Sequence, residues 1–148
     1  MTLSNTFVKS LTLGLLLAGS MAYAKGERTD PDAKARAVVM QAVAANTKIL
    51  GDMASGKTAF DAAAAEAAKA ALVEASAKAP VAFKMQGAAD PASEAKPEVW
   101  TNWEDFVKKA NGLAAAATAI DASTLDGVKA GVGGVGGTCK DCHTTYRM

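Results

Sequence analysis

The sequence predicts an all-α protein that folds as an antiparallel four-helix bundle. Half of its 148 residues are hydrophobic but only 5% are aromatic, so alanine and small aliphatic residues supply most of the apolar mass. Alanine favours helices and disfavours strands, which argues against a β-sandwich or a barrel. Four segments have helical character and are joined by mostly short connections. No single segment sustains enough heptads for the alternative of a coiled-coil dimer.

A secretory signal peptide is expected before the bundle, over residues 1–24. Lys9 precedes a short apolar run at residues 11–18, and Ala22-Tyr23-Ala24 has the small-x-small pattern that signal peptidases cleave. A membrane anchor is the alternative, but the run is shorter than the roughly 20 apolar residues that span a bilayer. We therefore expect a mature domain of residues 25–148, exported into an oxidising compartment.

The first two helices are expected in the first half of the mature domain. The first begins at Asp30-Pro31, a capping side chain followed by a residue with a fixed φ angle. The second begins at Thr58-Ala59-Phe60-Asp61, a capping-box variant, and ends before Pro80. Its apolar face consists almost entirely of alanine. One face of the first helix carries Val39, Val43, Asn46, Leu50 and Met53.

An irregular connection from about Pro80 to Lys96 leads to the last two helices. The third follows Pro97, and the fourth begins at Ser123-Thr124-Leu125-Asp126. One side of the third helix carries Trp100, Trp103, Phe106 or Val107, Ala110, Leu113 and Ala117. Steps of three and four in the fourth helix align Leu125, Val128, Val132, Val135, Cys139, Cys142 and Tyr146.

Glycine in the fourth segment conflicts with its helical assignment. The five glycines just before the cysteines would oppose a helix by roughly 4–5 kcal/mol, at about 1 kcal/mol each. Conflicts of this kind tend to mark functional sites. Glycine also allows a bulky planar group to lie directly against the backbone, and we expect that role for Gly131, Gly133, Gly134, Gly136 and Gly137.

Charge and histidine content exclude two kinds of function. Sixteen basic and fifteen acidic residues give a net charge of +1, without the basic excess of a nucleic-acid-binding protein. We therefore expect no nucleic-acid partner. The sequence holds one histidine, His143, so a metal site built from a pair of histidines within one chain is excluded.

The segment Cys139-Lys140-Asp141-Cys142-His143 has the C-x-x-C-H spacing of covalent haem attachment. Residues three apart share a helix face, so both thiols can add to the vinyl groups of one porphyrin, and the histidine can bind its iron. A thioredoxin-like dithiol would need a βαβ context, and a structural zinc site usually takes four ligands. A disulfide across so small a loop would stabilise little. We therefore expect one haem c, attached at Cys139 and Cys142, with His143 as the proximal iron ligand.

The haem motif at the end of a four-helix bundle resembles the class II cytochromes c, the cytochrome c′ family. The landmarks are Arg36, Met40, Gly56, Phe60-Asp61, Lys96-Pro97-Glu98-Val99-Trp100, Gly136-Gly137-Thr138, the haem motif and Tyr146-Arg147. The resemblance implies a periplasmic electron-transfer protein with periplasmic or membrane redox partners, and a homodimer formed through the first two helices. It also implies that Arg36 lies near a haem propionate and Arg147 beside the proximal histidine.

The sixth iron position separates two functions within this family. In one group an apolar side chain blocks the distal face of a five-coordinate, high-spin haem that binds nitric oxide or carbon monoxide. In the other a methionine of the first helix binds the iron and gives a low-spin carrier. Met40 lies one helical turn after Arg36, on the same face, and we expect it to be the distal ligand of a carrier of single electrons. The alternative is a gas-binding protein in which Met40 only blocks the distal face. We expect no enzymatic activity, because the one histidine is used by the iron.

Overall fold

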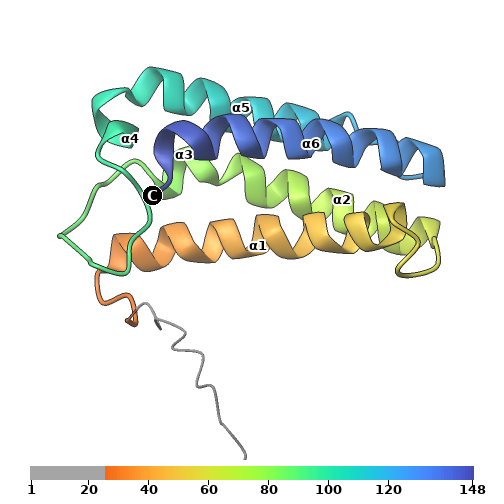
Figure 1. The fold of residues 1–148 in the computed structure, drawn as a ribbon, viewed down its shortest axis with the longest axis horizontal. Helices are drawn as coiled ribbons and strands as arrows, with labels where there is room; N and C mark the ends of the chain where they lie inside the picture. The colour runs from red at the N-terminus through yellow and green to blue at the C-terminus, as the bar shows by residue number, and fades with distance from the viewer. Residues whose placement is uncertain (1–25) are drawn as a thin grey trace, which may run out of the picture.

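The computed structural model describes residues 26–148, so the predicted signal peptide lies outside the described residues. Four long helices form the bundle, and two short ones flank the connection between its halves (Figure 1). The helices are α1 (Pro31–Ala54), α2 (Ala62–Ala77), α3 (Ala79–Ala82), α4 (Glu98–Thr101), α5 (Trp103–Thr118) and α6 (Leu125–Tyr146). Within residues 26–148 the β-structure is limited to one isolated bridge, between Ala95 and Arg147.

The long helices pack as a ring in which successive helices run in opposite directions (Figure 1). α1 packs against α2 and α6, and α5 packs against the same two helices. The prediction of an all-α antiparallel four-helix bundle is therefore confirmed. None of the helices in the described part of the chain combines the length and apolarity needed to cross a membrane.

Side-chain caps fix where three of the long helices begin. The Asp30 carboxylate accepts the Ala33 N–H at 2.8 Å, as the Asp-Pro start of the first helix predicts. Thr124 caps α6 in the same way. The predicted start of the second helix at Thr58 is wrong, because Asp61 is the capping residue and α2 begins only at Ala62. A turn at Gly56, with φ of 74°, occupies part of the intervening segment.

Two further boundaries differ from the sequence prediction. α2 ends before Pro80 as expected, but Pro80 lies in the first turn of α3, where its missing N–H costs nothing. The single third helix predicted after Pro97 is wrong, because Asn102 leaves the helical region and separates α4 from α5. With this break, the Trp100 indole N–H donates to the Phe83 carbonyl at 2.9 Å, while the Trp103 ring stacks on Phe106.

The core has two clusters, one toward each end of the bundle. The first includes Leu50, Leu72 and Val128, all fully buried, and Cys139 packs against it. The second centres on Val99 and Phe106, and Met40 and Cys142 pack against it. The two cysteines of the motif therefore join the two halves of the core.

Two aspartates attach the connection between the bundle halves to the start of α1. Asp90 accepts the backbone N–H groups of Thr29 and Asp30 at 2.8 and 3.0 Å, and Asp30 accepts that of Ala88 at 2.9 Å. Gly87 is required here, because its φ is 73° and a Cβ would lie 2.4 Å from an Asp30 carboxylate oxygen. The hydrogen bonds from the Asp30 and Thr29 N–H groups lower the pKa of Asp90, and those from the Ala33 and Ala88 N–H groups lower the pKa of Asp30.

We predict that acid weakens this attachment and that Asp90 contributes to the effect. Because the pKa of Asp90 is lower in the folded state, its stabilising contribution is present above the unfolded pKa of about 3.9. That contribution is lost as the pH falls through the folded pKa. Asp90→Asn should therefore be less stable than wild type at pH 7, with a shallower loss of unfolding free energy on acidification, as measured by denaturant titrations.

The control for this experiment is Glu66→Gln, which removes an exposed carboxylate from the middle of α2. Its unfolding free energy should match that of the wild type both at pH 7 and at acidic pH. An Asp90→Asn variant with the same stability and the same pH dependence as wild type would contradict this role of Asp90.

Candidate functional site

A cavity of about 690 Å³ lies inside the bundle, walled mainly by α1 and α6. This volume is within the roughly 300–1,000 Å³ typical of sites for small molecules and cofactors. The five residues predicted to form the haem site all line it: Arg36 and Met40 from α1, and Cys139, Cys142 and His143 from α6. Phe83, Phe106 and Leu113 contribute to an apolar wall.

α6 presents both thiols to the cavity, one helical turn apart. Cys139 and Cys142 are partly buried and free, with no disulfide between them. Burial raises the pKa of both thiols, so they are neutral at ordinary pH. The structure therefore holds two thiols on one face, as covalent attachment of a single porphyrin requires.

His143 lies at the rim of the same cavity, in the last turn of α6. The residue as a whole is exposed, but the protein around the imidazole lowers its pKa, and the positive charge of Arg147 adds to the effect. Among residues 26–148 no hydrogen bond occupies either ring nitrogen. A neutral imidazole with a free nitrogen can bind a metal ion.

Met40 lines the same cavity as the haem motif. It lies on α1, one turn after Arg36, and it packs in the same apolar cluster as Cys142. The face of α1 that carries Arg36 and Met40 therefore lines the cavity, and Val43 lies on the same face.

Arg36 is a buried cation in the cavity wall, with only 5% of its surface exposed. One guanidinium nitrogen donates to the backbone carbonyls of Met85 and Gln86, at 2.9 and 3.1 Å. The guanidinium carbon lies 5.2 Å from the Trp100 ring centroid and 5.8 Å from that of Phe83, within cation–π range. These contacts hold a positive charge at the cavity, and the binding of a propionate by Arg36 stays a prediction.

The C-terminus fastens the connection between the bundle halves beside His143. Arg147 forms an ion pair with Glu94 at 2.6 Å, and its backbone pairs with Ala95. The Lys96 N–H donates to the Tyr146 carbonyl at 2.9 Å. Glu94 has no local sequence pattern from which this role could be predicted, because its partner is 53 residues away.

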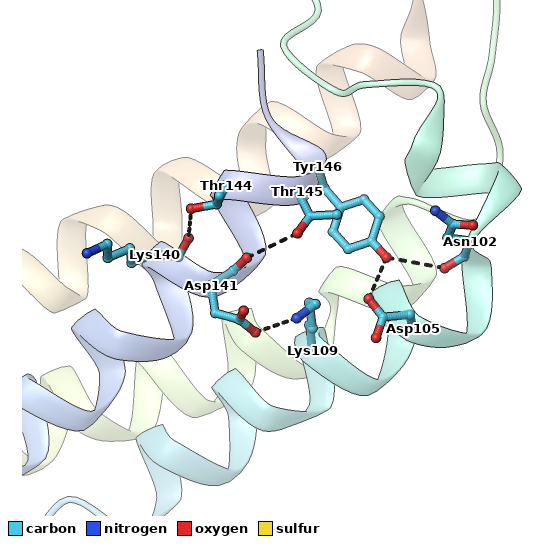
Figure 2. A network of polar contacts seen from close by, with 8 residues as sticks. All are labelled: Asn102, Asp105, Lys109, Lys140, Asp141, Thr144, Thr145 and Tyr146. Atoms are coloured by element: carbon cyan, nitrogen blue, oxygen red, sulfur yellow. Dashed lines mark hydrogen bonds and ion pairs between the residues drawn. The ribbon is translucent and has the colours of Figure 1, made fainter.

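A polar network near the end of α6 was also not predicted (Figure 2). The Tyr146 hydroxyl donates to the Asp105 carboxylate at 2.6 Å, and Lys109 pairs with Asp141 at 2.5 Å. Burial and the Asp105 hydrogen bond raise the pKa of Tyr146 to about 12, so its hydroxyl stays protonated. These contacts tie the haem-motif end of α6 to the first turns of α5.

The predicted role of the glycines in α6 is wrong. None of Gly131, Gly133, Gly134, Gly136 and Gly137 lines the cavity, although the helix continues through all of them. Gly131 instead allows a close approach of Ile120, because a Cβ there would lie 2.7 Å from an Ile120 side-chain carbon. For the other four, a Cβ would meet nothing within 4 Å.

The lining residues fit an iron porphyrin. Two thiols one turn apart match its two vinyl groups, and a neutral imidazole and a thioether among the lining residues are both side chains that can bind iron. Apolar and aromatic side chains supply most of the remaining contact surface, and Arg36 supplies a positive charge for a carboxylate.

Comparison with known proteins agrees with this geometry. Residues 32–147 match the family model described as Cytochrome C'. A cytochrome c' from Rhodopseudomonas palustris is 35% identical over 136 residues, which cover 90% of this chain and 91% of the relative. A cytochrome c-556 from Agrobacterium fabrum is 32% identical over 147 residues, covering 97% of this chain and 94% of the relative.

Solved structures show the same fold. The crystal structure of cytochrome c' from Rubrivivax gelatinosus gives a TM-score of 0.69 at 30% identity, covering 79% of this chain and 94% of that one. A mutant of cytochrome c prime from Alcaligenes xylosoxidans, complexed with nitric oxide, gives a TM-score of 0.70 at 28% identity and the same coverage.

We predict that the haem-loaded protein has weak tryptophan fluorescence. Trp100 and Trp103 pack in the cluster that contains Met40 and Cys142, so both indoles lie close enough to the cavity for energy transfer to a porphyrin. Emission should rise strongly when the holoprotein unfolds in denaturant, measured by steady-state fluorescence. Bright emission from the native holoprotein would contradict this placement of the two rings.

Proposed function

Because the chain belongs to the cytochrome c′ family, we propose that it carries single electrons, with His143 and Met40 as the two axial ligands of its iron. It is a monohaem class II cytochrome with one covalently attached haem c. In this proposal thioether bonds at Cys139 and Cys142 attach the haem. The predicted signal peptide over residues 1–24 would place the mature chain in the periplasm, where it meets periplasmic or membrane redox proteins.

The observation that carries the proposal is that Met40, on α1, lines the same cavity as the haem motif of α6. When bound, haem supplies the one-electron couple of its iron. His143 and Met40 would hold the iron in both oxidation states, which would lower the reorganisation that electron transfer needs. A methionine–histidine pair also raises the reduction potential.

The surrounding side chains support this chemistry. Arg36 presents a buried positive charge suited to a propionate. Arg147, next to His143, favours the neutral imidazole that binds iron. Phe83, Phe106 and Tyr146, whose rings contact one another through Phe106, give the cavity an apolar aromatic wall.

A gas-binding function is the second candidate. The cytochrome c prime mutant from Alcaligenes xylosoxidans is complexed with nitric oxide, and its fold is similar to this one. If Met40 packs over the iron without binding it, the haem is five-coordinate and high-spin, and nitric oxide or carbon monoxide can bind. Met40 is a flexible apolar side chain in an apolar cluster, so a packing role is chemically reasonable.

We predict that Met40→Ala converts a low-spin absorption spectrum into a high-spin one. Removing the thioether should also lower the reduction potential and open the iron to carbon monoxide. Visible spectra of the oxidised and reduced protein, together with a carbon monoxide titration, measure these changes.

Met53→Ala is the matched control for Met40→Ala. Met53 is a buried methionine of the same helix that does not line the cavity, so its replacement should cost about 2–5 kcal/mol of stability and leave the spin state unchanged. A wild-type protein that is already high-spin and binds carbon monoxide readily would reject Met40 as a ligand and favour the gas-binding function.

A homodimer through the first two helices also forms part of the proposed function. Val38 and Ile49 are 65% and 43% exposed on α1, and their spacing of three helical turns places them on one outer face. The adjoining α2 exposes small residues, including Ala63, Ala67 and Ala70, which permit a close helix–helix contact.

We predict that Ile49→Glu yields a monomer, because it places a charge in the buried part of that interface. Sedimentation equilibrium at several protein concentrations gives the oligomeric state. Val81→Glu is the control, since Val81 is equally apolar and 76% exposed but lies on α3, and this variant should stay dimeric. A wild-type protein that is monomeric at all concentrations would contradict the dimer.

A further inference from the structure

An open aromatic groove lies on the surface at the junction of α4 and α5. It is lined by residues 100–105 together with Thr145 and Tyr146 at the end of α6. The break at Asn102 produces this groove, because it places the half-buried rings of Trp100 and Trp103 on either side of a non-helical residue. The groove is separate from the cavity between α1 and α6.

Tyr146 connects the groove to the cavity, since it lines both. Its ring meets that of Phe106 edge-on, with centroids 5.4 Å apart, and Phe106 in turn stacks with Trp103 at 5.5 Å. Three aromatic rings in contact therefore extend from the cavity wall to the surface groove. Electron tunnelling falls steeply with distance, so a partner seated in this groove would lie behind a thin wall of packed rings.

The groove is acidic, although the chain as a whole is nearly neutral. Glu104 and Asp105 line it, and no basic residue does so among the described residues. Asp105 accepts a hydrogen bond from the Tyr146 hydroxyl (Figure 2). Glu104 is exposed and has no partner within residues 26–148. Lys109, one turn further along α5, has its charge directed to Asp141 instead.

We propose that this groove is the docking surface for a redox protein that presents lysine or arginine side chains. The proposal rests on the proposed electron-carrier function. A partner cation would lie against the Trp103 ring, by cation–π attraction, and beside the carboxylates of Glu104 and Asp105. In this exchange a single electron passes from the haem iron of the carrier to the metal centre of the partner. The carrier is oxidised by one electron and the partner is reduced by one electron.

The test uses the mature holoprotein and, as probe, a class I cytochrome c with a lysine-rich contact surface. Isothermal titration calorimetry at low ionic strength measures the dissociation constant. Glu104→Lys should weaken binding at least about tenfold, because it places a like charge against the partner cation. Glu66→Lys is the matched control: it makes the same change in net charge on an exposed site of α2 and should change binding less than about twofold.

A second variant keeps the docking proposal testable if Glu104→Lys perturbs the fold. Glu104→Gln removes the charge without reversing it, and it should weaken binding by an intermediate factor while leaving the absorption spectrum unchanged. Equal weakening by Glu104→Lys and Glu66→Lys would show attraction by net charge alone and overturn the proposal. The proposal would also be overturned if both Glu104 variants bound the probe as tightly as the wild type, or if the wild type showed no saturable binding.

Failure of the docking proposal can be distinguished from failure of the proposed function. Calorimetric binding to the groove does not depend on the spin state of the iron. A high-spin wild-type spectrum with groove-specific binding would reject Met40 as a ligand and retain the docking surface. A low-spin spectrum with no groove-specific binding would retain Met40 as a ligand and reject the docking surface.

Discussion

The fold has to keep a cofactor-sized cavity between α1 and α6 while these two helices stay in contact with each other. A cavity of this size lined by apolar atoms would destabilise so small a domain if it were not filled. The covalently attached haem c is therefore part of the hydrophobic core as well as the functional group. Cys139 and Cys142 join opposite halves of that core, so the attachment points of the cofactor lie where the two packed clusters meet.

One end of the molecule carries most of the polar contacts that support this cavity. Arg36 binds the carbonyls of the connection between the bundle halves, and Asp90 binds the backbone before α1. Arg147 and Glu94 fasten the same connection to the C-terminus. Each contact joins segments at least 49 residues apart, so the irregular connection is held in place by side chains rather than by its own backbone structure.

The function depends on what a single side chain of α1 does at the iron. A thioether that binds the iron gives a six-coordinate iron suited to electron exchange. A thioether that only packs over the iron leaves one coordination position for a diatomic gas. The same fold and the same proximal histidine serve both outcomes. The relatives named cytochrome c' and cytochrome c-556 are 35% and 32% identical to this chain, and the matches cover 91% and 94% of their lengths. Sequence similarity alone therefore does not choose between the two functions.

Features whose cause is local could be predicted from the amino-acid sequence. The cap at Asp30, the alternating steps of apolar residues and the spacing of Cys139, Cys142 and His143 all act within four residues along one helix, so they could be predicted before the fold was known. The expected role of Met40 at the iron came only from the family resemblance.

Tertiary structure alone decided the break at Asn102, the close approach of Gly131 to Ile120 and the pairing of Arg147 with Glu94. These features result from contacts between helices and connections that are distant in the sequence. Local propensity cannot predict such contacts, because the free energy that fixes them comes from packing in the assembled bundle.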